Sequence, residues 1–135
     1  MLDDPPMSLG MSNIPKSRQA IAEAFFDSCD EVICVSDFLG QYLACNQAFT
    51  AALGWPEKEL LDLGFVDLAP DNEREEVLGL GAAIVRAGGQ KQTYARPMRH
   101  RDGSYRLVLW TTWVDLSNRL VYGMGRVQGV VEIPG

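Results

Sequence analysis

The 135-residue sequence contains one histidine and three cysteines, too few for most metal and catalytic sites. Cys29, Cys34 and Cys45 form no C-x-x-C pair, and no group of histidines and cysteines has the spacing of a zinc site, so we expect no metal centre. The single His100 lies in an expected turn, and nearly all carboxylates lie in helix starts, turns or acidic surfaces. Neither a nucleophile with its base nor a pair of carboxylates in a cleft is indicated, so we expect no catalytic residues and no enzyme.

The sequence also lacks a long hydrophobic run and a secretory signal. No stretch reaches the roughly 18 apolar residues of a membrane span, and the N-terminus has neither the basic nor the apolar part of a signal peptide. An odd number of cysteines is typical of a reducing compartment, so we expect a cytoplasmic protein without membrane contact. The cysteines are then small buried side chains. A redox pair of Cys34 and Cys45, which lie in neighbouring expected strands, is the alternative.

Basic residues are scarce, 12 against 18 acidic ones, and the net charge is −6. This field repels phosphate groups, so we expect no nucleic-acid partner. Fifteen of the acidic residues precede Val77 and eight of the basic ones follow it, which indicates an acidic helical half and a basic strand half. The 47% hydrophobic share is ordinary for one globular domain of this length.

Turn and cap residues divide the first half of the chain. Residues 1–13 contain proline and glycine without periodicity, and we expect a flexible tail there. Residues 14–29 are predicted to form a flanking helix, whose first turn begins at Pro15. It has one apolar stripe that includes Ile21 and Phe25. After it, the patterns predict strands over 32–36 and 41–45, short helices over 47–53 and 56–61, a helical turn over 65–69 and a longer helix over 71–86.

Three strands are predicted in the second half, over 92–99, 104–116 and 120–128. Pro97 cannot donate a hydrogen bond to a neighbouring strand, so the first of the three should lie at a sheet edge. The middle strand is apolar at both even and odd positions between Leu107 and Val114. We therefore expect both faces of the sheet to be covered, one by the central helices and the other by the N-terminal helix or a second copy of the chain.

Six short segments, in this order and spacing, resemble segments of PAS domains. They are Val35-Ser-Asp37 with Gly40, Asn46-Gln-Ala-Phe49, Leu53-Gly-Trp-Pro-Glu-Lys-Glu-Leu60, Pro70-Asp71, Arg99-His-Arg-Asp-Gly-Ser-Tyr105 and Tyr122-Gly-Met-Gly-Arg126. The third is similar to the family's L-G-Y-x-x-E-E-L segment, and the fifth to its R-R-K-D-G-S-Y/R hairpin. The resemblance covers residues 30–128.

The resemblance implies an α+β fold, with a five-stranded antiparallel sheet in the order 2-1-5-4-3, helices on one face and an N-terminal flanking helix. We expect the flanking helix at 14–29, the PAS domain at 30–128 and a C-terminal tail at 129–135. PAS domains are typically sensors attached to kinases, cyclases or transcription factors. The expected function is sensing of a small ligand and signalling through the flanking helix. The alternative is a ligand-free interaction module of a histidine kinase in a two-component system, or of a transcription regulator.

Strand parity in the family places the ligand pocket between the sheet and the helices. The expected pocket residues are Cys34, Cys45, Phe49, Leu53, Leu80, Ile84, Tyr94, Val108, Trp110 and Thr112. The family's flanking helix often mediates dimerisation on the outer sheet face. We accordingly expect a homodimer through Ile21, Phe25, Leu107, Leu109 and Trp113.

Two cofactor types are not expected. Light-sensing LOV members need a reactive cysteine in an N-C-R-F-L-Q motif, and the corresponding residues 64–69 contain none. Haem-binding members usually carry an axial histidine on the long helix, whereas His100 lies in a distant hairpin turn. Flavin bound without a covalent adduct stays open, and the cofactor is left unassigned.

Overall fold

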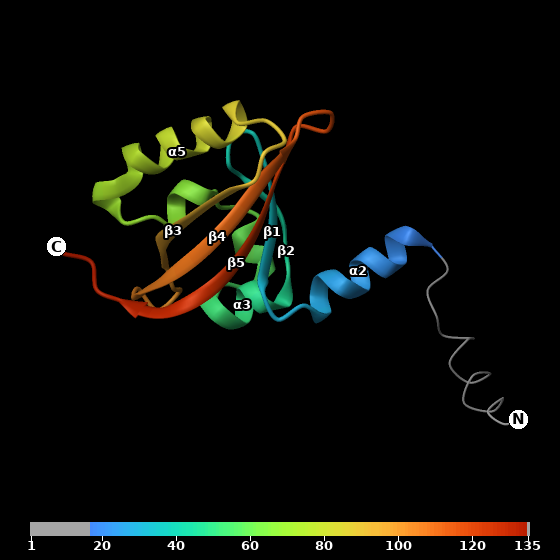
Figure 1. Cartoon of the computed structure of the whole chain (residues 1–135). Helices are drawn as coiled ribbons and strands as arrows, with labels where there is room; N and C mark the ends of the chain where they lie inside the picture. The colour runs from blue at the N-terminus through green and yellow to red at the C-terminus, as the bar shows by residue number, and fades with distance from the viewer. Residues whose placement is uncertain (1–16, 135) are drawn as a thin grey trace, which may run out of the picture.

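A computed structural model describes residues 17–134, which form one antiparallel sheet with helices on one face (Figure 1). The strand order is β2-β1-β5-β4-β3, as predicted. The elements are α2 (Arg18–Ser28), β1 (Val32–Asp37), β2 (Tyr42–Cys45), α3 (Gln47–Leu53), α4 (Glu57–Leu60), η1 (Phe65–Leu68), η2 (Asp71–Glu73), α5 (Arg74–Arg86), β3 (Gln92–Arg99), β4 (Tyr105–Asp115) and β5 (Leu120–Val131).

Asn46 joins three elements at the start of α3. It caps that helix, and its Oδ1 accepts hydrogen bonds from the backbone N–H groups of Phe49 and Ile33. Its Nδ2 donates to the carbonyls of Phe26 and Glu31, both at 2.9 Å. The side chain is fully buried, so all of its hydrogen-bonding capacity goes to the backbone of α2, β1 and α3.

Neither edge strand of the sheet offers a full row of free backbone hydrogen-bonding groups. Pro97 lies in β3, which is an edge strand as the proline predicted. The other edge strand, β2, has four residues. Its Tyr42 N–H donates to the Leu63 carbonyl, and its Cys45 N–H donates to a carboxylate oxygen of Glu57.

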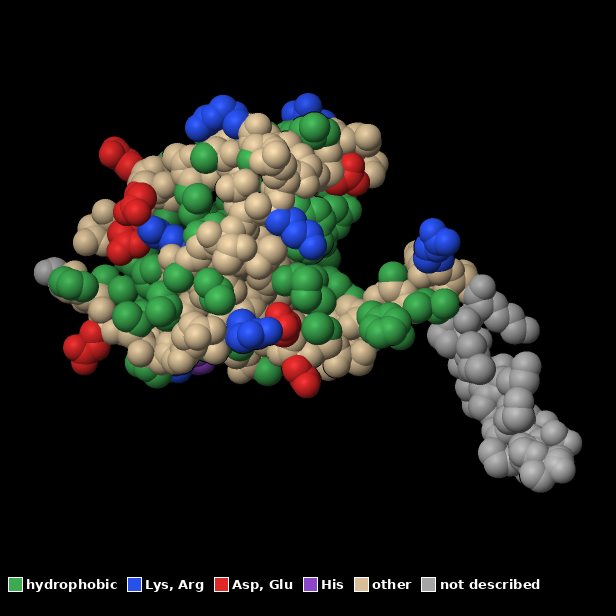
Figure 2. All heavy atoms as spheres, in the orientation of Figure 1, with side chains coloured by type: hydrophobic (Ala, Val, Ile, Leu, Met, Phe, Trp, Pro, Cys, Tyr) green, Lys and Arg blue, Asp and Glu red, His purple; other side chains and the backbone are tan. Residues whose placement is uncertain are grey.

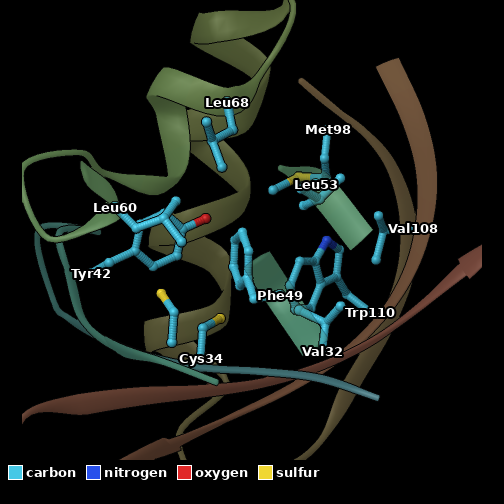
Figure 3. Close-up of a cluster of buried hydrophobic side chains, with 11 residues drawn as sticks. Val32, Cys34, Tyr42, Phe49, Leu53, Leu60, Leu68, Met98, Val108 and Trp110 are labelled. Atoms are coloured by element: carbon cyan, nitrogen blue, oxygen red, sulfur yellow. The ribbon is translucent and has the colours of Figure 1, made fainter. Parts of the chain in front are cut away.

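The hydrophobic core fills the space between the sheet and helices α3 and α4. Phe49, Leu53 and Trp110 are its large members, and Figure 3 shows them converging from α3 and β4. Trp110 lies over two glycines of β5. A β-carbon at Gly125 would stand 2.9 Å from its ring, and one at Gly123 would stand 3.4 Å from it. Glycine is therefore what lets the indole lie flat on the sheet.

Several boundaries differ from the prediction. The Ser17 side chain caps α2, so the helix begins at Arg18 and not at Pro15, which lies with the whole 1–13 segment outside the described residues. The helix ends at Ser28, where it contacts α3, and it projects away from the sheet (Figure 1). It therefore does not cover the outer face of its own sheet, which was one of the two expected arrangements. Strand β5 runs on to Val131, which pairs with Tyr105, so residues 129–131 of the predicted tail are strand.

Candidate functional site

A cavity of about 280 Å³ lies between α5 and the inner face of the sheet. The floor consists of small side chains on β1, β4 and β5, among them Cys34, Thr112 and Gly123. Gly81 faces it from α5, and a β-carbon there would meet no atom within 4 Å. The cavity exists because small residues face one another across this part of the domain.

The cavity reaches the surface beside the turn between β1 and β2. Leu39 in that turn is 93% exposed, and Leu78 of α5 is also exposed, yet both line the cavity. Phe38 forms the neighbouring wall, and the guanidinium of Arg119 lies 5.2 Å from its ring centroid. The entrance is therefore framed by apolar side chains of α5 and of the β1–β2 turn.

Ion pairs attach the start of α5 to the sheet. Arg96 of β3 pairs with Glu73, and with Glu76 at 2.9 Å. Arg99 donates to Asp71 at 3.2 Å. These contacts hold the N-terminal end of the helix against β3. Farther along α5 the helix stands over the cavity.

Half of the expected pocket residues line this cavity. Cys34, Ile84, Tyr94, Trp110 and Thr112 form part of its wall. The other five lie outside the wall: Cys45, Phe49, Leu53 and Val108 belong to the buried core, and Leu80 is half-buried on α5.

Several wall residues were missed by the sequence analysis. Phe38, Phe65 and Val66 come from a turn and from η1, which have no strand parity to indicate an inward face. On α5 the wall is centred on Gly81, with Val77 and Val85 beside it. Val77, Gly81 and Val85 are four residues apart along the helix, and this spacing was the available signal.

Hydroxyl groups are the main polar feature of the wall. The Tyr42 OH and the Thr112 Oγ1 are fully buried. The Tyr42 OH has no hydrogen-bond partner among the described residues, and the Thr112 Oγ1 has the Tyr94 side chain beside it. Burial raises the pKa of the Tyr42 phenol well above its usual value, and it raises that of Tyr94 to about 12. All three groups are therefore neutral in the physiological range, and each can donate or accept a hydrogen bond.

Cys34 and Cys45 lie directly opposite one another in the β1–β2 pair, and both are free thiols. Burial raises the pKa of the Cys34 thiol strongly and that of Cys45 to about 12. A thiol held in its protonated form is a poor nucleophile. Only Cys34 borders the cavity.

The expected dimer residues lie on two separate surfaces of the chain. On the outer sheet face, Trp113 of β4 stacks on Tyr122 of β5 at 5.8 Å between ring centroids, and Leu109 is exposed. On α2, Ile21 is exposed and Phe25 is 70% exposed. Leu107 is half-buried on β4. Figure 2 shows hydrophobic side chains, in green, both on the body of the domain and on the projecting helix.

None of the helices within residues 17–134 is long and apolar enough to cross a bilayer. The same range holds no group of three or more histidine, cysteine, aspartate or glutamate side chains arranged to bind a metal ion.

Comparison with known proteins identifies the architecture. A family model described as PAS fold matches residues 21–124. The sensor histidine kinase TmoS of Ectopseudomonas mendocina is 27% identical over 114 residues, which are 84% of this chain but only 11% of TmoS.

Two solved structures share the fold at lower identity. A domain of a sensory box sensor histidine kinase/response regulator from Geobacter sulfurreducens has a TM-score of 0.72 at 23% identity, over 81% of this chain and 93% of that one. The PAS domain of the Cronobacter turicensis RpfR quorum-sensing receptor, solved in complex with BDSF, has a TM-score of 0.62 at 19% identity, over 74% and 95%. With the family model matching most of its length, the chain belongs to the PAS family.

Proposed function

We propose that this chain is a regulatory sensory module that binds a small molecule in the cavity under α5 and passes the change to α2. The observation that carries the proposal is the apolar cavity of about 280 Å³, whose wall includes the buried Tyr42 hydroxyl with no partner among the described residues. An apolar cavity of roughly 150 Å³ is already large enough to bind benzene. A small organic molecule would fill the space and pair the hydroxyl.

The relatives support this proposal in two ways. The RpfR domain with the same fold was solved with BDSF bound, which supports a ligand role for the present cavity. TmoS and the Geobacter protein are histidine kinases, which supports a kinase as the effector in a two-component system. A transcription regulator stays the alternative effector. We also propose a cytoplasmic location for the chain.

Asn46 offers the route from the cavity to α2. Cys34 is part of the cavity wall, and the neighbouring Ile33 N–H donates to the Asn46 Oδ1 at 2.9 Å. The Nδ2 of the same side chain donates to the Phe26 carbonyl in α2. A ligand that shifts β1 would thus move the last turn of the flanking helix through one amide group.

Native mass spectrometry of the chain purified from cells tests the proposal. Gly81→Leu puts a large side chain into the cavity, and Gly79→Leu puts the same side chain on the exposed face of the same helix. We expect an extra bound mass on the wild type and on Gly79→Leu, and none on Gly81→Leu. Bare chains in all three samples would favour the ligand-free interaction module instead.

A homodimer is the second proposal, and the exposed apolar side chains favour it. Phe25 and Ile21 of α2 are not covered by any of residues 17–134, and Leu109 is exposed on the outer sheet face. Packing α2 of one copy on the sheet of another would bury both surfaces. Phe25→Glu should shift the molar mass measured by light scattering from dimer towards monomer. Gln19→Glu, which adds the same charge elsewhere on α2, should leave it unchanged, and equal masses for wild type and Phe25→Glu would refute the dimer.

A further inference from the structure

The cavity wall contains almost no charge. Its single acidic side chain is Asp37, at the β1–β2 turn. One oxygen of that carboxylate already accepts hydrogen bonds from the backbone N–H groups of Leu39 and Gln41. Among the described residues, no lysine, arginine or histidine borders the cavity. The guanidinium of Arg119 lies outside this wall, against the Phe38 ring at the entrance. A carboxylate or phosphate deep inside would therefore lie without a counter-charge, which is strongly unfavourable in an apolar interior.

The wall does contain enclosed hydrogen-bonding groups. Tyr42 is 2% exposed and Thr112 is 5% exposed, and the hydroxyl oxygen of each is fully enclosed. Buried hydroxyls in folded proteins are nearly always hydrogen-bonded, so the Tyr42 hydroxyl indicates an oxygen or nitrogen atom supplied by something else. The Thr112 hydroxyl has the Tyr94 side chain beside it and can take a second partner. Figure 3 shows the Tyr42 ring entering from β2 with its oxygen directed towards the interior.

The two hydroxyls come from strands that are not neighbours in the sheet. Tyr42 comes from β2 and Thr112 from β4, and strands β1 and β5 separate them in the sheet. At a spacing of about 4.8 Å between neighbouring strands, their backbones are roughly 14 Å apart. Tyr94, on the edge strand β3, adds a third hydroxyl to the Thr112 side. Apolar walls lie between these polar positions.

We propose that the cavity selects an uncharged, largely apolar molecule with a hydroxyl or carbonyl oxygen, bound by the Thr112 or Tyr42 hydroxyl, and rejects its carboxylate counterpart. This inference rests on the proposed ligand role of the cavity and adds the class of ligand. Thr112 and Tyr42 are the specificity-determining residues. They pair the polar atom of the ligand, and the uncharged wall excludes anions.

Matched probes separate charge from shape. We would titrate the folded chain at neutral pH with 2-naphthol and 2-naphthoate, which share a ring, and with 1-octanol and octanoate, which share a chain. Binding is followed by the amide chemical shifts of cavity residues, with Gly81→Leu to show that the site is the cavity. We expect at least one alcohol to bind, and its carboxylate partner to bind roughly 100-fold more weakly.

Isosteric variants test the hydroxyls. Thr112→Val and Tyr42→Phe keep the shape of the wall and remove one oxygen each, and the one that contacts the ligand should weaken alcohol binding roughly 3- to 10-fold. Thr111→Val and Tyr122→Phe are the controls, because both residues lie in the same sheet without lining the cavity. They should leave the affinity unchanged. The melting temperature of each variant shows that it is folded.

The possible results separate this inference from the proposed function. A carboxylate that binds as tightly as its alcohol would overturn the charge rule and leave the ligand role standing. Alcohol binding unaffected by both hydroxyl variants would overturn the roles of Thr112 and Tyr42. Failure of all four probes to shift the cavity residues, together with bare chains in native mass spectrometry, would overturn the inference and the proposed function together.

Discussion

Replacing Asn46 with alanine should lower the free energy of unfolding by about 3 kcal/mol. The side chain makes four hydrogen bonds, but the Phe49 N–H also donates to the Asn46 backbone carbonyl at 3.1 Å and keeps that partner in the variant. Three bonds are then lost without replacement, those to Ile33, Phe26 and Glu31. Each contributes about 1 kcal/mol, and their partners lie where water has limited access.

Urea unfolding followed by tryptophan fluorescence measures this loss. Asn46→Asp separates the two ends of the amide, because the carboxylate still accepts from Ile33 but cannot donate to Phe26 and Glu31. It should lose about 2 kcal/mol or more. Asn72→Ala, at an exposed position of η2, is the control and should change stability by less than about 0.5 kcal/mol. A loss below about 1 kcal/mol for Asn46→Ala would refute the reasoning, because the amide could not then be the link between α2 and the sheet.

Three further perturbations follow from the packing and the buried thiols. Gly125→Ala places a β-carbon 2.8 Å from a valine methyl, so it should lower the free energy of unfolding, measured in urea, by about 2 kcal/mol. Gly123→Ala, whose β-carbon would have its nearest contact at 3.2 Å, should lower it by less. A larger loss for Gly123→Ala than for Gly125→Ala would contradict the packing. Gly79→Ala should raise the stability by about 1 kcal/mol, since the new methyl meets no atom within 4 Å in the helix; a lower melting temperature would contradict this. Burial raises the thiol pKa of Cys34 and of Cys45 in the folded protein, that of Cys45 to about 12, whereas the thiols of the unfolded chain ionise near 9.0. The stability that these two groups contribute is therefore complete below pH 9 and falls as the pH rises above it. The urea midpoint should therefore drop between about pH 8 and about pH 10.5, less so in the double alanine variant, and an equal drop would show that other groups are responsible.

Elements bounded by strong local signals were predicted well. Asn46 and Gly54 delimit α3 at the expected residues, because a side-chain cap and a left-handed glycine act within one turn of helix. Pro97 identified the edge strand from its missing N–H. The end of β5 was missed because Gly129, with φ of +141°, resembles a strand terminator. In the structure it sits at a shift in register opposite Leu107, after which pairing with β4 continues.

The candidate site was half predictable for a different reason. Strand alternation correctly separates inward from outward positions, so it finds Trp110 and Thr112. Alternation does not show which inward-facing side chains are covered by a helix and which face a cavity. Val108, for example, packs in the core with Phe49 and Leu53 of α3. The position of the cavity depends on how α5 lies over the sheet. Contacts between distant parts of the chain determine that arrangement.

The two sheet edges limit how copies of this protein can associate. An open edge strand offers a row of free N–H and C=O groups onto which another chain can add by strand pairing, the first step of many fibrils. Here Pro97 interrupts one edge, and on the other the N–H groups of Tyr42 and Cys45 are taken by the Leu63 carbonyl and the Glu57 carboxylate. Growth of the sheet from one molecule into the next is therefore discouraged at both ends. The apolar residues left exposed on α2 and on the outer sheet face can then support a closed assembly without also seeding an open-ended one.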